Sequence, residues 1–140
     1  MLIKIITAGK PSNEFFEIFE KYQKRINSFA KFEHASVKPQ NLFNTLLKTK
    51  KDFHLVLLDE NGKLYNSLEF AKHLEQTALI KSNICFAVGP AEGFKDEEKS
   101  IADELLSLTS MTLQHDIATL VLYEQIYRAL TILPSHPYHK

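Results

Sequence analysis

Hydroxyl, imidazole and phenol groups gather in the last quarter of the chain. Residues 107–112 hold two serines and two threonines, His115 follows, and the chain ends in Tyr138, His139 and Lys140. A hydroxyl-rich loop in an apolar setting offers backbone N–H and C=O groups, which suit the edge of an adenine ring better than a phosphate. The terminal side chains are of types that transfer or orient protons. We therefore expect a ligand loop here and candidate catalytic groups in the tail.

Simpler explanations exist for both features. Thr112 is a plausible N-cap for the helix that follows the loop, and a capping role is compatible with ligand binding. Chain termini are usually frayed, so disorder is the default for an anonymous tail.

Three of the four glycines, Gly9, Gly62 and Gly89, follow expected strands directly or within a few residues. For a single glycine a turn is the ordinary explanation. In open α/β sheets, however, ligands bind beyond the carboxyl ends of the strands, where a missing side chain lets the backbone approach them. Residues 89–93 are therefore the first candidate for a ligand loop.

Several common site types are not indicated. The sequence has neither a G-x-G-x-x-G nor a P-loop motif, and its histidines are not spaced as metal ligands. Its one cysteine, Cys85, lies in an apolar run and is expected to be buried and unreactive. Ser107, His115 and Asp116 do not suggest a hydrolase, because the G-x-S-x-G elbow is missing and adjacent helical side chains point apart.

The elements that would position these groups alternate between strands and helices. A capping box of Asn66 and Glu69 begins one helix, and residues 59–62 are expected to form a turn. This alternation predicts one α/β domain over residues 1–140, with a mainly parallel sheet and flanking helices. The expected strands cover residues 2–8, 29–37, 53–58, 83–88 and 105–109, and the expected helices cover residues 12–26, 39–51, 66–79, 95–104 and 114–133.

The last expected helix, residues 114–133, is apolar nearly all round. Such a helix is buried on more than one side, either within the domain or against a second subunit. We favour a dimer contact. Glu124 and Arg128 lie four residues apart in the order that favours an ion pair along the helix.

Charge is unevenly distributed, although the formal net charge is zero. Residues 1–51 hold ten Lys or Arg against four Glu, whereas residues 52–140 hold seven against thirteen Asp or Glu. The basic first third is either a solvated surface or a face that binds a phosphate backbone. No apolar run is long enough to cross a membrane, and the first residues do not look like a secretory signal, so we expect a cytoplasmic protein.

Five segments in order resemble the ribosomal RNA large subunit methyltransferase H family of the SPOUT superfamily. Residues 3–10 also resemble the opening strand and glycine of that family, so the likeness runs from end to end. The segments are LDENGK at residues 58–63, FAVGPAEG at 86–93, LSLTSMTLQH at 106–115, EQIYRA at 124–129 and PYHK at 137–140.

This resemblance implies an α/β fold whose carboxyl-terminal part is threaded into a deep trefoil knot that forms the cofactor pocket. It implies a homodimer that uses S-adenosylmethionine to methylate N3 of a pseudouridine in 23S ribosomal RNA of the assembled ribosome. No metal and no membrane are implied. The alternative from another class is a non-catalytic, ribosome-associated module that keeps the fold.

The resemblance also implies site residues. His115 or His139 would act as base or orienting group, and Tyr138 would stack on or hydrogen bond to the uracil ring. Lys140 and the basic amino-terminal helices would bind phosphates. Two positions depart from the family pattern, with Pro90 in place of a second glycine and Thr119 in place of an arginine. The implied cofactor contacts are Leu58, Gly89, Leu108, Thr109, Ser110, Met111, Thr112 and Leu113.

Overall fold

Five parallel strands form one sheet in the order β2-β1-β4-β3-β5. The structure is a computed structural model and describes residues 1–134 and 138–139. Parallel strands need crossover connections, and the helices between them supply these. The strands are β1 (Leu2–Ala8), β2 (Lys31–Val37), β3 (His54–Leu64), β4 (Asn83–Val88) and β5 (Glu104–Ser107).

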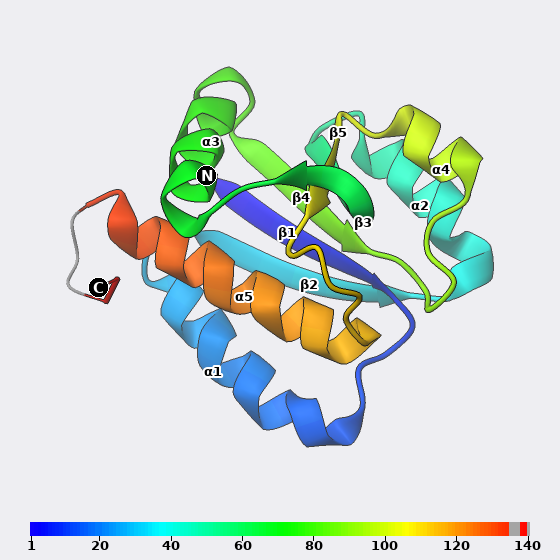
Figure 1. Cartoon of the computed structure of the whole chain (residues 1–140), viewed down its shortest axis with the longest axis horizontal. Coiled ribbons are helices and arrows are strands. Elements are labelled where there is room, and N and C mark those ends of the chain that lie inside the picture. The colour runs from blue at the N-terminus through cyan, green and yellow to red at the C-terminus, as the bar shows by residue number, and fades with distance from the viewer. Residues whose placement is uncertain (135–137, 140) are drawn as a thin grey trace.

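Helices cover both faces of the sheet, so the molecule has three layers (Figure 1). The helices α1, α3 and α5 pack side by side on one face, while α2 and α4 lie on the other. Two short 3-10 turns, Asn13–Phe15 and Pro39–Asn41, precede α1 and α2. The helices are α1 (Phe16–Asn27), α2 (Leu42–Thr49), α3 (Ser67–Ile80), α4 (Asp96–Ile101) and α5 (His115–Ile132).

The strand side chains alternate between the two layers of core. Ile3 and Ile5 of β1 face the core under α1, α3 and α5, whereas Ile6 faces the core under α2 and α4. Because both faces are covered, the strands read as continuous apolar runs in the sequence. The predicted α/β fold with a mainly parallel sheet is confirmed.

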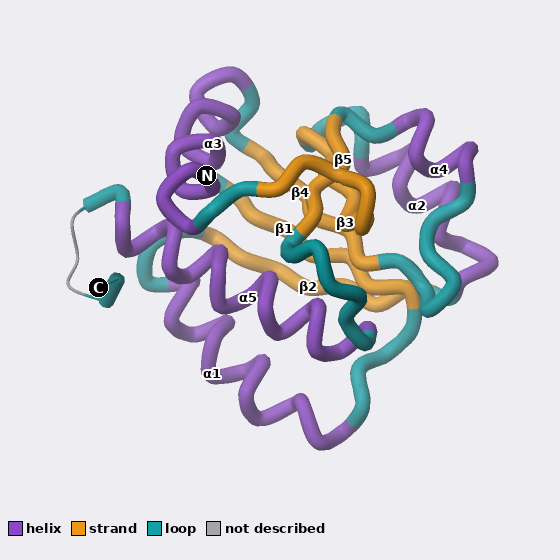
Figure 2. The backbone as a smooth tube through the Cα atoms, viewed as in Figure 1, coloured by secondary structure: helices purple, strands orange, loops and turns teal. Residues whose placement is uncertain are grey.

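The third strand is longer than the sequence predicts. The expected turn at residues 59–62 is wrong, because these residues belong to β3. β3 pairs with β5 twice, first at Val56 to Leu58 and again at Lys63 and Leu64, and the register shifts between the two stretches. Figure 2 shows the end of β3 curling over the sheet. Close backbone approach explains Gly62, since a Cβ there would lie 2.6 Å from the carbonyl carbon of Leu105.

Other element boundaries moved by a few residues. β2 begins at Lys31 rather than residue 29, β5 ends at Ser107 rather than residue 109, and α4 is shorter than expected. The capping box of α3 is confirmed, because Asn66 Oδ1 accepts from the Glu69 N–H and Glu69 Oε1 accepts from the Asn66 N–H.

The predicted Thr112 cap is wrong, because the N-cap of α5 is Gln114. Its side-chain oxygen accepts hydrogen bonds from the backbone N–H groups of Asp116 and Ile117, at 3.0 and 3.1 Å. Thr112 lies two residues earlier, in the loop.

Most apolar side chains of α5 are buried by other elements of the same chain. The helix lies on the sheet between α1 and α3, and Leu122, Tyr123 and Ile126 are fully buried there. The predicted ion pair is present, with both Arg128 Nε and Nη2 bonded to Glu124 Oε1 at 3.0 and 2.6 Å. Across the described part of the chain, no helix combines the length and apolar character needed to span a membrane.

Cys85 lies in the centre of the sheet on β4. Its side chain is fully buried, and burial raises the pKa of the thiol to about 12. A thiol with so high a pKa is not ionised near neutral pH, so Cys85 is inert, as expected.

Candidate active site

A pocket of about 330 Å³ lies where β3 and β4 end and where the chain leaves β5 for α5. Its volume falls in the range of pockets that hold small ligands, and its position beyond the carboxyl ends of parallel strands is the one expected for this class of sheet. The lining residues are Leu58 to Asn61, Val88 to Phe94, Lys99, Leu106, Leu108, Thr109, Met111 to Leu113, His115 and Ala118.

The structure brings together nearly all the predicted cofactor residues, which come from three separate segments. Leu58 lies on β3, Gly89 follows β4, and the others belong to the loop before α5. Ser110 alone of the predicted set is not among the lining residues. A side-chain hydrogen bond from Ser107 Oγ to the Thr109 carbonyl oxygen, at 2.8 Å, fixes the start of the loop.

The loop after β4 is a tight turn against an aromatic ring. A Cβ on Gly89 would lie 3.1 Å from the buried ring of Phe94. The Gly93 N–H donates to the Pro90 carbonyl at 2.8 Å, and Gly93 has a φ of +84°, which favours glycine. The ligand loop predicted at residues 89–93 therefore forms one wall of the pocket.

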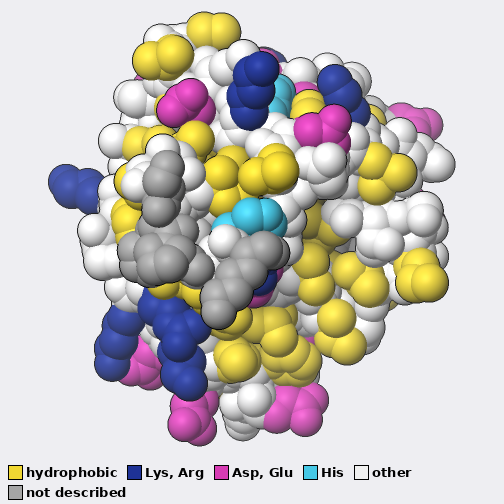
Figure 3. Space-filling view, turned by 60° about the vertical axis from the view of Figure 1, so that its left-hand side comes forward, with side chains coloured by type: hydrophobic (Ala, Val, Ile, Leu, Met, Phe, Trp, Pro, Cys, Tyr) yellow, Lys and Arg dark blue, Asp and Glu magenta, His cyan; other side chains and the backbone are white. Residues whose placement is uncertain are grey.

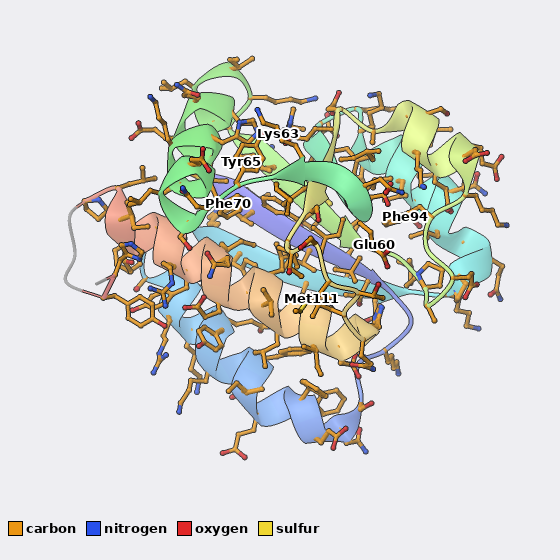
Figure 4. All side chains as sticks on the ribbon, viewed as in Figure 1. Glu60, Lys63, Tyr65, Phe70, Phe94 and Met111 are labelled. Atoms are coloured by element: carbon orange, nitrogen blue, oxygen red, sulfur yellow. The ribbon has the colours of Figure 1, made fainter. Side chains whose placement is uncertain are left out.

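Charged side chains from β3 also line the pocket, and the sequence did not predict them. Asp59, Glu60 and Asn61 line the pocket, and Lys99 lies 3.2 Å from Asp59 as an ion pair. Figure 4 shows Glu60 near Phe94 at this edge of the sheet. The sequence does carry a signal for these side chains, since three polar residues directly follow a buried apolar run. The same three residues are also typical of a turn, which is what the sequence predicts. Together with Glu92, these carboxylates make the pocket attractive to a cationic ligand.

His115 lies in the pocket wall at the first turn of α5. Its Nδ1 is 2.8 Å from the carbonyl oxygen of Gly89, and its Nε2 is buried. The neighbouring Asp116 points elsewhere, since it accepts hydrogen bonds from the backbone and hydroxyl of Ser12. The Ser107 hydroxyl donates to the Thr109 carbonyl and His115 Nδ1 contacts Gly89, so these residues do not form a Ser-His-Asp triad.

A buried polar chain connects α1, α5 and the first two strands. Gln23 donates to the Tyr123 hydroxyl, which lies 2.7 Å from His34 Nδ1, while His34 Nε2 lies 2.9 Å from Thr7 Oγ1. Burial, and secondarily the charge of His115, lowers the pKa of His34 to about 4. His34 is therefore neutral at pH 7 and serves as a hydrogen-bonding link rather than a charge.

The tail residues Tyr138 and His139 lie against α5 and do not line the pocket of their own chain. The Tyr138 hydroxyl donates to Glu124 at 3.2 Å, and His139 Nδ1 lies 3.1 Å from Arg128. Burial, contact with Tyr22 and the charge of Glu124 raise the pKa of Tyr138 to about 12, so its phenol stays protonated. Lys140 lies outside the described residues.

The face that carries the tail presents groups of Lys and Arg side chains beside hydrophobic ones (Figure 3). On α1, Lys21, Lys24 and Arg25 are exposed, and the Arg25 guanidinium stacks on the rings of Tyr22 and Tyr127. The basic amino-terminal third of the sequence thus contributes exposed cations to α1.

The two departures from the family pattern have different consequences. Thr119 is fully buried and its hydroxyl donates to the His115 carbonyl within α5, so it cannot replace an exposed guanidinium. Pro90 occupies the first position of the turn after Gly89, where its carbonyl is used and its missing N–H is not needed.

Histidines away from the pocket pair with a carboxylate. His54 and His73 each place Nε2 within 2.9 Å of Glu104. Among residues 1–134 and 138–139, no group of three or more His, Cys, Asp or Glu side chains is placed to hold a metal ion.

Comparison with known proteins agrees with this architecture. The family described as predicted SPOUT methyltransferase matches residues 1–139. The chain is 39% identical over 142 residues to a ribosomal RNA large subunit methyltransferase H of Coprothermobacter proteolyticus, with all of both chains covered.

Two solved structures share the fold at low sequence identity. A probable methylase family protein from Haemophilus influenzae has a TM-score of 0.63 and 13% identity, and the match covers 99% of this chain and 70% of that one. The SpoU methyltransferase AviRb from Streptomyces viridochromogenes, solved with AdoMet, has a TM-score of 0.53 and 12% identity, with 96% and 61% covered. The full-length family match and the full-length relative together place this chain in the SPOUT methyltransferase family, among the ribosomal RNA large subunit methyltransferase H proteins.

Proposed function

We propose that this protein transfers a methyl group from S-adenosylmethionine to N3 of a pseudouridine in 23S ribosomal RNA of the assembled ribosome. The observation that carries the proposal is the pocket, because Leu58, Gly89 and the loop before α5 converge there from three segments. The relatives' name supplies the substrate class, large-subunit ribosomal RNA.

The pocket residues fit such a cofactor. Gly89 lines the pocket with its backbone and packs against the Phe94 ring, and the loop before α5 carries apolar side chains such as Leu108 and Leu113 that can flank an adenine ring. Asp59, Glu60 and Glu92 complement a cationic group. When bound, the cofactor would supply a sulfonium methyl group for transfer to a nucleophile.

The target nitrogen needs assistance from the protein. N3 of the base is an imide nitrogen, and its proton must leave as the methyl group is transferred in line to it. Tyr138, whose phenol stays protonated, is suited to donate a hydrogen bond to a carbonyl of the base, and His139 is a candidate to accept the proton. His115 is the third candidate of the catalytic set.

We place these tail residues in the partner's site of a cytoplasmic homodimer. Tyr138 and His139 lie away from the pocket of their own chain, which supports action in trans. Large apolar side chains are exposed on α5, in the loop before it, at the end of β3 and on α3, and a second subunit would cover such a surface. They are Met111, Ile117, Leu64 and Leu68.

The test uses ribosomes from cells that lack the modification. Incubation with S-adenosylmethionine labelled in the methyl group should place label in large-subunit RNA, and nucleoside analysis should identify N3-methylpseudouridine. Free, deproteinised RNA is the control for the requirement for an assembled ribosome.

Two outcomes would contradict the proposal in different ways. Measurable cofactor binding without label in the RNA would favour a non-catalytic ribosome-associated module. The observation that favours this alternative is Thr119, which is buried and uncharged where the family has an arginine. A protein that does not bind S-adenosylmethionine in calorimetry would remove the cofactor assignment itself.

A further inference from the structure

The proton arrangement on His115 is fixed by its partner. Gly89 O can only accept a hydrogen bond, so the proton between it and His115 Nδ1, 2.8 Å away, belongs to the imidazole. In the neutral ring Nε2 is then the unprotonated nitrogen. That nitrogen is buried and has no hydrogen-bond partner among the described residues. His115 thus directs its donor to the pocket loop and keeps its basic nitrogen out of solvent.

This contact joins two walls of the pocket that are 26 residues apart in sequence. Gly89 precedes the turn that Pro90 and Gly93 close, and the Phe94 ring lies where a side chain on the glycine would be. A glycine next to a turn has wide conformational freedom. A contact on its carbonyl restricts the orientation of the peptide, and His115 provides that contact from the first turn of α5.

The surroundings of Nε2 oppose a role as proton acceptor. A proton placed there would create a buried cation without a hydrogen-bond partner among the described residues, which is costly. His34 lies close enough to His115 for a charge on His115 to lower the pKa of His34. The nearby carboxylate of Asp116 accepts from Ser12 through Oδ2, whereas its Oδ1 is buried and has no hydrogen-bond partner among the described residues.

We propose that His115 is a positioning residue for methyl transfer: in its Nδ1–H form it holds the Gly89 carbonyl, and with it the loop of residues 89–93, in the cofactor-binding geometry without exchanging a proton with the substrate. The inference rests on the proposed function. Of the two roles that the sequence left open for His115, base or orienting group, it selects the orienting one.

Two amide substitutions distinguish the contribution of His115 Nδ1 from that of Nε2. The amide nitrogen of His115→Asn occupies the place of Nδ1 and can still donate to Gly89, whereas that of His115→Gln occupies the place of Nε2 and cannot. We expect His115→Asn to bind S-adenosylmethionine about tenfold more tightly than His115→Gln or His115→Ala, the equivalent of one hydrogen bond of about 1.4 kcal/mol. The loss in the Gln and Ala variants should appear in the KM for the cofactor, while the pH profile of kcat keeps its shape.

A general base gives the opposite pattern. If His115 takes the proton from N3, the Asn and Gln variants should lose kcat equally and the acidic limb of the pH profile should disappear from both. Either result would overturn the positioning role. Far-ultraviolet circular dichroism and thermal melting of all three variants identify any that fail to fold, and the comparison of Asn with Gln uses only folded proteins.

A spectroscopic measurement tests the inference without catalysis. Long-range ¹⁵N–¹H correlation spectra of histidine-labelled wild-type protein at pH 7 should show His115 as the Nδ1–H tautomer, assigned by its absence from the Ala variant. An Nε2–H tautomer or an imidazolium would contradict the inference even if the enzyme is active. A protein that shows the Nδ1–H tautomer but does not bind S-adenosylmethionine would instead contradict the proposed function.

Discussion

Gly62 and Gly89 both lie where a side chain would collide, but their neighbours differ in how far they can yield. A Cβ on Gly62 would meet the backbone of Leu105 at 2.6 Å, whereas one on Gly89 would meet the ring of Phe94 at 3.1 Å. A ring can move by a few tenths of an ångström, but a paired strand cannot move alone. A substitution at Gly62 therefore tests how tightly the backbones of β3 and β5 pack together.

We predict that Gly62→Ala lowers the free energy of unfolding by about 1–3 kcal/mol, the usual cost of overpacking. Gly89→Ala should cost less stability and act mainly on cofactor affinity, because its neighbour is a side chain. Urea denaturation of both variants and the wild type measures the difference. Equal destabilisation by the two substitutions would mean that β5 adjusts as easily as a phenyl ring.

His34 makes the stability of the fold depend on pH. Its pKa is about 4 in the folded chain and 6.5 in the unfolded chain, so between these values the unfolded chain binds more protons. The free energy of unfolding therefore falls as the pH falls through this interval. We expect a loss of up to about 2 kcal/mol between pH 7 and pH 5.

Denaturant unfolding at several pH values measures this loss, and His34→Gln is the matched variant. The substitution disturbs the contacts with Tyr123 and Thr7, so it should lower stability at pH 7. Its stability should nevertheless change less between pH 7 and pH 5 than that of the wild type. If the free energy of unfolding of His34→Gln changes with pH as much as that of the wild type, groups other than His34 cause the pH dependence.

At the scale of elements, a reciprocal capping box begins α3. Asn66 and Glu69 satisfy each other's backbone N–H groups where the chain leaves the curled end of β3. We predict that Asn66→Ala lowers the free energy of unfolding by about 1 kcal/mol. Glu75→Ala, an exposed change on the same helix, is the control and should stay within about 0.5 kcal/mol of the wild type.

The elements predicted best from sequence were those with strong local signals. The apolar runs of β1 and β4 have the bounds that the sequence predicts, and the long apolar segment of α5 locates it to within a residue at each end. The end of β3 could not be predicted in this way, because residues 59–62 have the composition of a turn. They lie between the two stretches of β3 that pair with β5, Val56 to Leu58 and Lys63 to Leu64, so their conformation depends on contacts that are distant in the chain.

The site shows the same division. Gly89 and the loop before α5 were predicted, because glycine after a buried strand and a dense run of hydroxyls are visible locally. The carboxylates of Asp59 and Glu60 were missed, since only the curled strand turns them toward the pocket. The trefoil knot stays a prediction from the family resemblance, because periodicity carries no information about threading.

At the scale of the whole molecule, the position of the tail leads to a prediction about which subunit of the proposed homodimer it serves. Suppose that Tyr138 and His139 complete the partner's site. A dimer that pairs a His139→Ala subunit with a Gly89→Val subunit then has one site with both parts intact. Randomly mixed dimers should recover about a quarter of wild-type activity from two inactive parents.

The measurement is RNA methylation after the two variants have been unfolded and refolded together, with each variant refolded alone as the control. A tail that serves its own chain predicts no recovery, because every chain in the mixture then carries a defect in its own site. No recovery despite mixed dimers seen by native mass spectrometry would therefore contradict the arrangement in trans.

The burial of Cys85 has a practical consequence for such experiments. The chain has a single cysteine, its thiol is buried in the middle of the sheet, and burial raises its pKa to about 12, so we expect little reaction with maleimides in the folded state. The natural sequence is therefore ready for selective labelling without removal of a native thiol. A cysteine introduced at Met111, which is 74% exposed at the mouth of the pocket, could carry a fluorophore that reports ligand entry in real time.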